Sequence, residues 1–127
     1  MKLRIARHTE DLNRMIDFYG RILGLKVLGE FKNHLNYDGV FLGIPSAEWH
    51  LEFTISELPP VHFPDDDDLL VFYAPSINEF NIIKERLVTN KIKHVNPKNP
   101  YWKNNGITFE DPDGFRIVLS LIRSDKV

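Results

Sequence analysis

Two polar residues on one predicted strand could do chemistry together. The segment Trp49–Ile55 alternates polar and apolar residues, as a half-buried β-strand does. Alternation places His50 and Glu52 on the same face, and an imidazole and a carboxylate are both metal ligands. With His8, near the start of the chain, they would form a set of two histidines and one carboxylate, which suits Zn²⁺ or Fe²⁺. The spacing is not diagnostic of a metal site, and a histidine is more often an ordinary hydrogen-bonded residue, which is the interpretation we favour.

A permanent cation stands on a second predicted strand. Leu3–Ala6 is short and mostly apolar, and alternation gives Arg4 one face while Leu3 and Ile5 take the other. A guanidinium can pair with a carboxylate through two parallel hydrogen bonds, so Arg4 is a candidate partner for Glu52. The pair would either contact a ligand or form a structural ion pair.

The composition excludes several classes of protein. The chain has 127 residues, which suits one domain, and its hydrophobic fraction of 43% is ordinary for a globular protein. The net charge is −2 and the Lys and Arg residues are scattered, which argues against a nucleic-acid surface. Cysteine is absent, so a disulfide framework, a thiol nucleophile and a zinc–thiolate site are excluded.

The sequence also lacks the motifs of several further classes of protein. The N-terminal segment lacks the apolar core of a signal peptide, and no segment approaches the roughly 20 apolar residues that span a bilayer. We therefore expect a cytoplasmic protein with no membrane partner. The chain contains no recognisable Ser-His-Asp arrangement, phosphate-binding glycine loop or dinucleotide fingerprint.

The first half of the chain predicts one strand, one helix and three further strands. Thr9 offers an N-cap oxygen ahead of apolar residues at helical spacing, and Gly24 suits a left-handed helix stop. The expected elements are a strand at Leu3–Ala6, a helix that follows Thr9 with Glu10 and Asp11 in its first turn and ends at about Leu23, and strands at Leu25–Phe31, Tyr37–Leu42 and Trp49–Ile55.

The second half repeats this order after a linker. Glu57–Asp68 contains three prolines and four consecutive aspartates, which is typical of a solvated connection. Ser76 and Glu79 form a capping box that opens a helix to about Thr89. The expected strands are Leu69–Ala74, Ile92–Val95, Ile107–Glu110 and Phe115–Leu121, with a tight turn at Asp111–Gly114. We therefore expect an α+β protein forming a single domain over residues 1–127, with module 1 at about 1–58, a linker at about 59–68 and module 2 at about 69–127.

Three segments carry a resemblance to a known superfamily. They are the helix signature Asp11-Leu12, Ile16–Tyr19 and Leu23–Leu25, the strand motif His50-Leu51-Glu52-Phe53, and the terminal hairpin Asp111–Ile117. Together and in this order they resemble the vicinal oxygen chelate superfamily of glyoxalase, bleomycin-resistance and ring-cleaving dioxygenase proteins. The resemblance implies two βαβββ modules that form a cupped mixed β-sheet with the helices outside.

The resemblance also implies four positions for a divalent metal. They fall on Arg4, Glu52, Leu69 and Val118, and only Glu52 can ligate a metal. A catalytic metal needs about three protein donors, so the metal site is expected to be degenerate and no cofactor is expected, although a divalent metal at a shifted site stays possible. Arg4 would then supply the charge that a metal supplies in related proteins.

The expected function is metal-independent binding of a small molecule, in the manner of the bleomycin-resistance branch, by a homodimer. The expected ligand-binding residues include Tyr101 and Trp102 at the rim, in a predicted loop at 99–106, and the whole set is Arg4, His50, Glu52, Tyr73, Tyr101, Trp102 and Arg116. One alternative is a glyoxalase-like lyase or isomerase that uses Glu52 as a base, without a metal or with the shifted site of His8, His50 and Glu52. Another is a vestigial cup on a protein-binding subunit.

Overall fold

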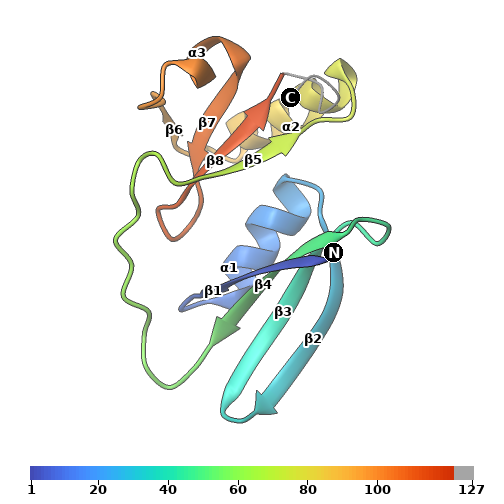
Figure 1. Cartoon of the computed structure of the whole chain (residues 1–127), viewed down its shortest axis with the longest axis vertical. Coiled ribbons are helices and arrows are strands. Elements are labelled where there is room, and N and C mark those ends of the chain that lie inside the picture. The colour runs from blue at the N-terminus through green and yellow to red at the C-terminus, as the bar shows by residue number, and fades with distance from the viewer. Residues whose placement is uncertain (122–127) are drawn as a thin grey trace. The chain divides into compact units, whose positions relative to one another are not determined.

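The same strand order occurs twice in the protein, in two four-stranded mixed sheets (Figure 1). The first sheet has the order β1-β4-β3-β2 and the second has the order β5-β8-β7-β6. In each, the first and last strands of the module pair in parallel and the remaining neighbours pair antiparallel. The computed structural model describes residues 1–121 and divides into two compact units, Met1–Val61 and a second that begins at His62. We call these units module 1 and module 2.

The prediction of an α+β fold made of two βαβββ modules is confirmed. Module 1 comprises β1 (Leu3–His8), α1 (Leu12–Met15), the π-helix η1 (Ile16–Ile22), β2 (Lys26–His34), β3 (Tyr37–Gly43) and β4 (Trp49–Ile55). Module 2 comprises β5 (Leu69–Tyr73), α2 (Ile77–Thr89), β6 (His94–Val95), α3 (Tyr101–Asn105), β7 (Gly106–Glu110) and β8 (Arg116–Ser120). No helix among residues 1–121 is long and apolar enough to cross a membrane.

The first helix departs from the expected α-helix after one turn. Its N-cap is Asp11, whose carboxylate accepts a hydrogen bond of 3.2 Å from the Arg14 amide, and not Thr9 as predicted. Thr9 is instead buried and continues the strand pairing, because its amide donates to the Thr54 carbonyl at 2.8 Å. The prediction failed because a Thr and an Asp two residues apart offer equivalent capping oxygens.

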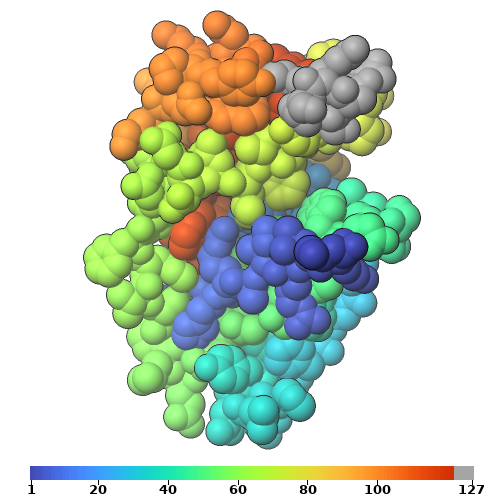
Figure 2. Space-filling model, viewed as in Figure 1, coloured from blue at the N-terminus to red at the C-terminus, as the bar shows by residue number. Residues whose placement is uncertain are grey.

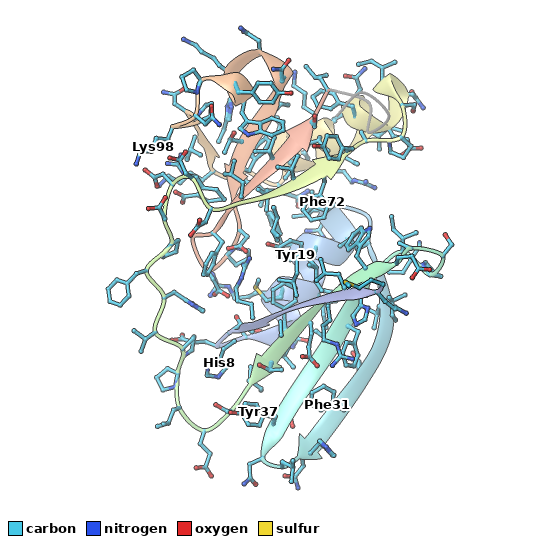
Figure 3. All side chains as sticks on the ribbon, viewed as in Figure 1. His8, Tyr19, Phe31, Tyr37, Phe72 and Lys98 are labelled. Atoms are coloured by element: carbon cyan, nitrogen blue, oxygen red, sulfur yellow. The ribbon has the colours of Figure 1, made fainter. Side chains whose placement is uncertain are left out.

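The π-helix buries two consecutive aromatic side chains in the core of module 1. Phe18 and Tyr19 are 2% and 0% exposed, and their ring centroids lie 4.8 Å apart in an edge-on arrangement. Tyr19 also stacks on Phe53 of β4 at 5.0 Å, on the helix side of the sheet (Figure 3). A π-helix turns less per residue than an α-helix, so neighbouring residues can share one buried face. On its exposed side, hydrogen bonds from Arg21 lower the pKa of the Asp17 carboxyl.

The helices of module 2 differ in how well the sequence predicts them. α2 begins where expected, because the Ser76 hydroxyl accepts a 3.1 Å hydrogen bond from the Glu79 amide. The segment 99–106 was expected to be a loop, but Tyr101–Asn105 forms the short helix α3, which packs on β7 and β8. The side-chain amide of Asn105 closes this helix by donating to the Tyr101 carbonyl at 2.8 Å, and Trp102 of the same helix is buried. One turn of helix is too short for periodicity to reveal.

The β7–β8 hairpin depends on one buried carboxylate. Asp111 is 5% exposed and accepts hydrogen bonds from the amides of Asp113 and Phe115, at 2.9 and 3.0 Å. The Asp111 amide in turn donates to the Phe115 carbonyl at 2.7 Å. These contacts close the turn predicted at this position and set the start of β8.

Gly106 is required by close packing, which gives a direct test of the β7–β8 pairing. Its backbone is extended, but a Cβ atom would lie 2.7 Å from the Leu119 carbonyl oxygen and 2.8 Å from Val118 Cγ1. We predict that Gly106→Ala lowers the free energy of unfolding by about 1–3 kcal/mol, the usual cost of overpacking. The measurement is the midpoint of urea denaturation.

Gly29 provides the matched control for this substitution. A Cβ atom there would meet Phe41 at 3.5 Å, an ordinary contact. Gly29→Ala should therefore change the free energy of unfolding by less than about 1 kcal/mol. Equal denaturation midpoints for the two variants would contradict the packing described for β7 and β8.

Candidate functional site

The parallel pairing of β1 with β4 brings three of the predicted site residues onto one face of module 1. The register aligns Arg4 with His50 and Ala6 with Glu52. Leu51 and Phe53, which alternate with these residues along β4, are 3% and 2% exposed, and Phe53 stacks on the helix side of the sheet. His50 and Glu52 therefore project from the opposite face, as the alternation of β4 predicts.

Arg4 reaches across β4 and makes three different contacts there. Its Nε donates a hydrogen bond of 3.1 Å to His50 Nε2, and its Nη1 lies 3.7 Å from Glu52 Oε2. The guanidinium carbon lies 4.8 Å from the centroid of the Phe41 ring on β3. A cation in this position is attracted both by the carboxylate and by the negative face of the aromatic ring.

Two aromatic side chains that the sequence reasoning missed extend this cluster. Phe41 lies opposite Glu52 in the β3–β4 register, and its ring centroid is 5.6 Å from the His50 ring and 5.8 Å from the Phe31 ring. Phe31 on β2 lies flat over its cross-strand partner Gly39, because a Cβ atom there would come within 2.3 Å of the ring. We call Arg4, Phe31, Phe41, His50 and Glu52 the arginine–aromatic face. Figure 3 labels Phe31 on this sheet.

The arginine–aromatic face has hydrogen-bonding capacity that the protein does not use. Of the five N–H groups of Arg4, only that on Nε donates a hydrogen bond to any residue within 1–121, and the side chain is 53% exposed. The Glu52 side chain is only 12% exposed, yet neither of its oxygens accepts a hydrogen bond from this part of the chain. Neither Glu52 oxygen is among the buried, unpartnered side-chain atoms of the described residues, so both stay accessible to a donor from water or from a ligand.

The Arg4 hydrogen bond selects one tautomer of His50. A guanidinium nitrogen can only donate, so His50 Nε2 is the acceptor and the ring proton belongs on Nδ1. Nδ1 has no protein partner among the described residues. In this tautomer His50 offers a further N–H group beside those of Arg4.

The donors present do not fit a divalent metal. No group of three or more His, Asp or Glu side chains in residues 1–121 is arranged to hold an ion. The structure does not bring His8 together with His50 and Glu52, because His8 lies at the end of β1, where its Nε2 is 3.0 Å from the Ser56 hydroxyl (Figure 3). His50 already accepts from Arg4, which leaves Glu52 as the one available ligand of the expected set.

β1 is an edge strand, and this changes the expected burial of its apolar residues. Leu3 and Ile5 were expected to pack against the helix, but they are 56% and 38% exposed. The sheet order places β1 at the edge, with a strand on one side only. Figure 2 shows the side chains of this strand at the molecular surface. Arg4 therefore approaches its partners from the rim of the sheet and not from its centre.

The predicted site residues of module 2 are placed less favourably for ligand contact. Arg116 is held within its own module, because its Nη2 lies 3.3 Å from Asp66 and its Nη1 donates to the Asn96 carbonyl at 3.1 Å. Tyr73 is half-buried at the end of β5. Tyr101 is 49% exposed and stacks edge-on against Trp102, which is 9% exposed. The ligand-binding roles of these four residues stay predictions.

A separate cavity in module 1 does not contain the predicted site. It has a volume of about 330 Å³ and lies among the start of α1, β2, β3 and the end of β4. It shares Phe31 and Gly39 with the arginine–aromatic face, but Arg4, His50 and Glu52 do not line it. Its charged lining residues are four acids, Glu10, Asp11, Glu30 and Asp38, and one base, Lys32.

The chain matches two family models and one closely similar protein. The models are described as the YycE-like N-terminal domain, at residues 3–54, and the YycE-like C-terminal domain, at residues 67–120. The uncharacterised protein YycE of Bacillus subtilis (strain 168) is 48% identical over 126 residues, which covers 93% of this chain and 86% of that protein. A crystal structure of a YycE protein of unknown function from Bacillus subtilis has a TM-score of 0.86 and 46% identity, and covers 97% of this chain and 90% of that one.

More distant structures share the fold. Glyoxalase I of Leishmania major has a TM-score of 0.75 at 22% identity, and the alignment covers 99% of this chain and 88% of that one. The fosfomycin resistance protein FosX of Mesorhizobium loti has a TM-score of 0.71 at 14% identity, over 97% of this chain and 92% of that one. The family models and the 48% identical relative lead to one conclusion: the chain belongs to the YycE-like family, and it shares the fold of glyoxalase and fosfomycin-resistance proteins.

Proposed function

We propose that the protein binds a small organic molecule on the arginine–aromatic face of module 1 and that it does so without a metal. The observation that supports this most directly is the Arg4 guanidinium, which rests on Phe41 between His50 and Glu52 while four of its five N–H groups stay unused by the described residues. The small-molecule partner, the absence of a cofactor and the homodimer expected from the resemblance all belong to this proposal.

The charge of Arg4 would replace the charge of a metal ion. The superfamily resemblance implies a metal ligand at the position of Arg4, and a guanidinium cannot ligate a cation because it has no free lone pair. It can instead present a fixed positive charge with several directed donors, which suits carboxylate and phosphate groups. A divalent ion placed beside Glu52 would also be repelled by a guanidinium at 3.7 Å from that carboxylate.

Phe31 and Phe41 would supply the apolar part of the binding surface. Both side chains are half-buried, and their rings lie beside the charged groups on the same face. Small-molecule sites typically combine a mainly apolar lining with a few placed polar groups. The proposed site follows this pattern, with two rings around one cation, one carboxylate and one imidazole.

Replacing Arg4 tests the proposal directly. We predict that Arg4→Gln weakens the binding of acidic aromatic compounds by about tenfold or more, the usual effect of losing a charge-assisted hydrogen-bond pair. The measurement is a ligand-observed NMR screen of small aromatic acids, amines and neutral analogues, followed by titration of each compound that binds.

Lys26→Ala is the matched control, because Lys26 is an exposed cation of the same module that lies outside the arginine–aromatic face. It should leave binding unchanged. A protein that binds none of the compounds, or one whose binding survives Arg4→Gln unaltered, would contradict the proposed site.

A metal series tests the second half of the proposal. We predict that Zn²⁺, Mn²⁺, Ni²⁺ and Fe²⁺, added to chelator-treated protein, leave its thermal unfolding temperature unchanged. A specific ion at 100 times its Kd would instead stabilise the fold by about 2.7 kcal/mol. The readouts are the unfolding temperature and the metal content of the purified protein.

Metal binding in this series would instead support the enzyme alternative. Stoichiometric metal that is lost in both Glu52→Gln and His8→Ala would support a shifted site and a glyoxalase-like lyase or isomerase. His94→Ala is a suitable control, because this exposed histidine of module 2 belongs to neither proposed site. Metal binding that the control also removes would not support either site.

A further inference from the structure

The Glu52 carboxylate can accept hydrogen bonds that the described residues do not donate. Its side chain is 12% exposed, and within residues 1–121 its only charged neighbour is Arg4, at 3.7 Å, which is beyond hydrogen-bonding distance. Its oxygens are not fully buried, so a ligand group can reach them and donate a charge-assisted hydrogen bond. A hydroxyl or an ammonium group on a ligand can do this.

Arg4 offers the complementary feature next to Glu52. Neither of its Nη groups donates a hydrogen bond to residues 1–121. Together they form the planar edge of the guanidinium that can donate to two oxygens of one anion. His50 Nδ1 carries a further proton without a protein partner. The N–H groups around Arg4 therefore favour a ligand group with at least two acceptor oxygens and a negative charge.

The short distance between the two groups lets one small ligand contact both. Arg4 Nη1 and Glu52 Oε2 are 3.7 Å apart, so an anion bound by one and a donor bound by the other can lie on neighbouring atoms of the ligand. A donor on the carbon next to the anionic group is the most compact arrangement that makes both contacts.

The two phenyl rings determine the rest of the molecule. Phe41 lies directly beneath the guanidinium and Phe31 lies beyond it, 5.8 Å from Phe41 between ring centroids. An apolar group attached to the anionic group of the ligand would lie over these rings. An aromatic group would be attracted to them, as aromatic pairs are at such distances. A charged or strongly hydrated ligand group over the two rings would lose its hydration without gaining a hydrogen-bond partner.

We infer that the ligand is an α-hydroxy or α-amino acid with an aromatic or other apolar side chain. Arg4 holds its carboxylate, Glu52 accepts a hydrogen bond from its α-hydroxyl or α-ammonium group, and Phe31 and Phe41 contact its side chain. This inference depends on the proposed function, because it names the class of molecule bound at the same face.

The experiment compares probes that differ by one group. Isothermal or NMR titration measures the affinities of 3-phenyllactate, phenylalanine, 3-phenylpropionate and 3-phenylpropane-1,2-diol. 3-Phenylpropionate lacks the α donor, and the diol lacks the carboxylate. We expect phenyllactate or phenylalanine to bind at least about tenfold more tightly than either truncated probe, since a site built to hydrogen-bond a group rejects the analogue without it. The stronger of the two binders distinguishes an α-hydroxyl ligand from an α-ammonium ligand.

Substitutions assign each preference to its residue. Glu52→Leu removes the acceptor at similar size and should abolish the preference for phenyllactate or phenylalanine over phenylpropionate, while Glu52→Gln, which keeps an oxygen acceptor, should retain part of it for phenyllactate. Arg4→Gln should weaken all carboxylate probes by a common factor of about ten. The exposed Lys26→Ala should change none of these affinities.

The possible results separate this inference from the proposal on which it depends. If phenylpropionate binds as tightly as phenyllactate and phenylalanine, and binding still requires Arg4, the ligand class is wrong and the binding site stands. If the diol binds best, or none of the four probes binds while other acids do, the inference is also overturned. If Arg4→Gln leaves the affinity of every compound unchanged, both the inference and the proposed function fail. The wild-type comparison alone decides the ligand class, even where a variant does not fold.

Discussion

The Arg4 guanidinium, placed over Phe41 between His50 and Glu52, is the interaction on which the other features of the site depend. It uses the His50 ring as an acceptor, and it is the only charge that opposes the largely buried Glu52 carboxylate within residues 1–121. Removing it would leave that carboxylate nearly buried without a counter-charge, which is a more costly state than the pair. One side chain from the edge strand therefore connects the charged, imidazole and aromatic groups of this face.

The fold provides the geometry that this contact needs. Parallel pairing of β1 with β4 puts Arg4 beside His50, and the next strand, β3, brings Phe41 within reach of the guanidinium across β4. Glycine makes room for the aromatic rings, because Phe31 can lie flat only where Gly39 has no side chain. The helix packs on the other side, where Tyr19 stacks on Phe53, and leaves this face to the polar residues.

Local sequence patterns predicted much of this arrangement. Alternation along Trp49–Ile55 placed His50 and Glu52 on one face, the capping box located the start of α2, and the repeated element order predicted two modules of the same topology. Each of these features depends on residues that are close in the chain, so periodicity and capping chemistry reveal them. The resemblance to the superfamily then gave the position of Arg4 relative to Glu52.

The features that were missed depend on register between distant segments. Nothing in the sequence shows that Phe31 is the cross-strand partner of Gly39 or that Phe41 lies opposite Glu52. Both facts come from the pairing of β2, β3 and β4. The ion pair of Arg116 on β8 with Asp66 of the preceding acidic segment was also missed, while the ligand-binding role of Arg116 stays a prediction. A polar, extended segment gives no sequence signal for such a partner.

The protonation state of His50 offers the most direct measurement of the central contact. The nitrogen chemical shifts of its ring, recorded by long-range ¹H–¹⁵N correlation at neutral pH, report which nitrogen carries the proton. The Arg4 contact predicts the tautomer with the proton on Nδ1 and a bare Nε2, and a loss of this preference in Arg4→Gln. A ring protonated on Nε2 in the native protein could not accept from Arg4, and that result would contradict the account of this face.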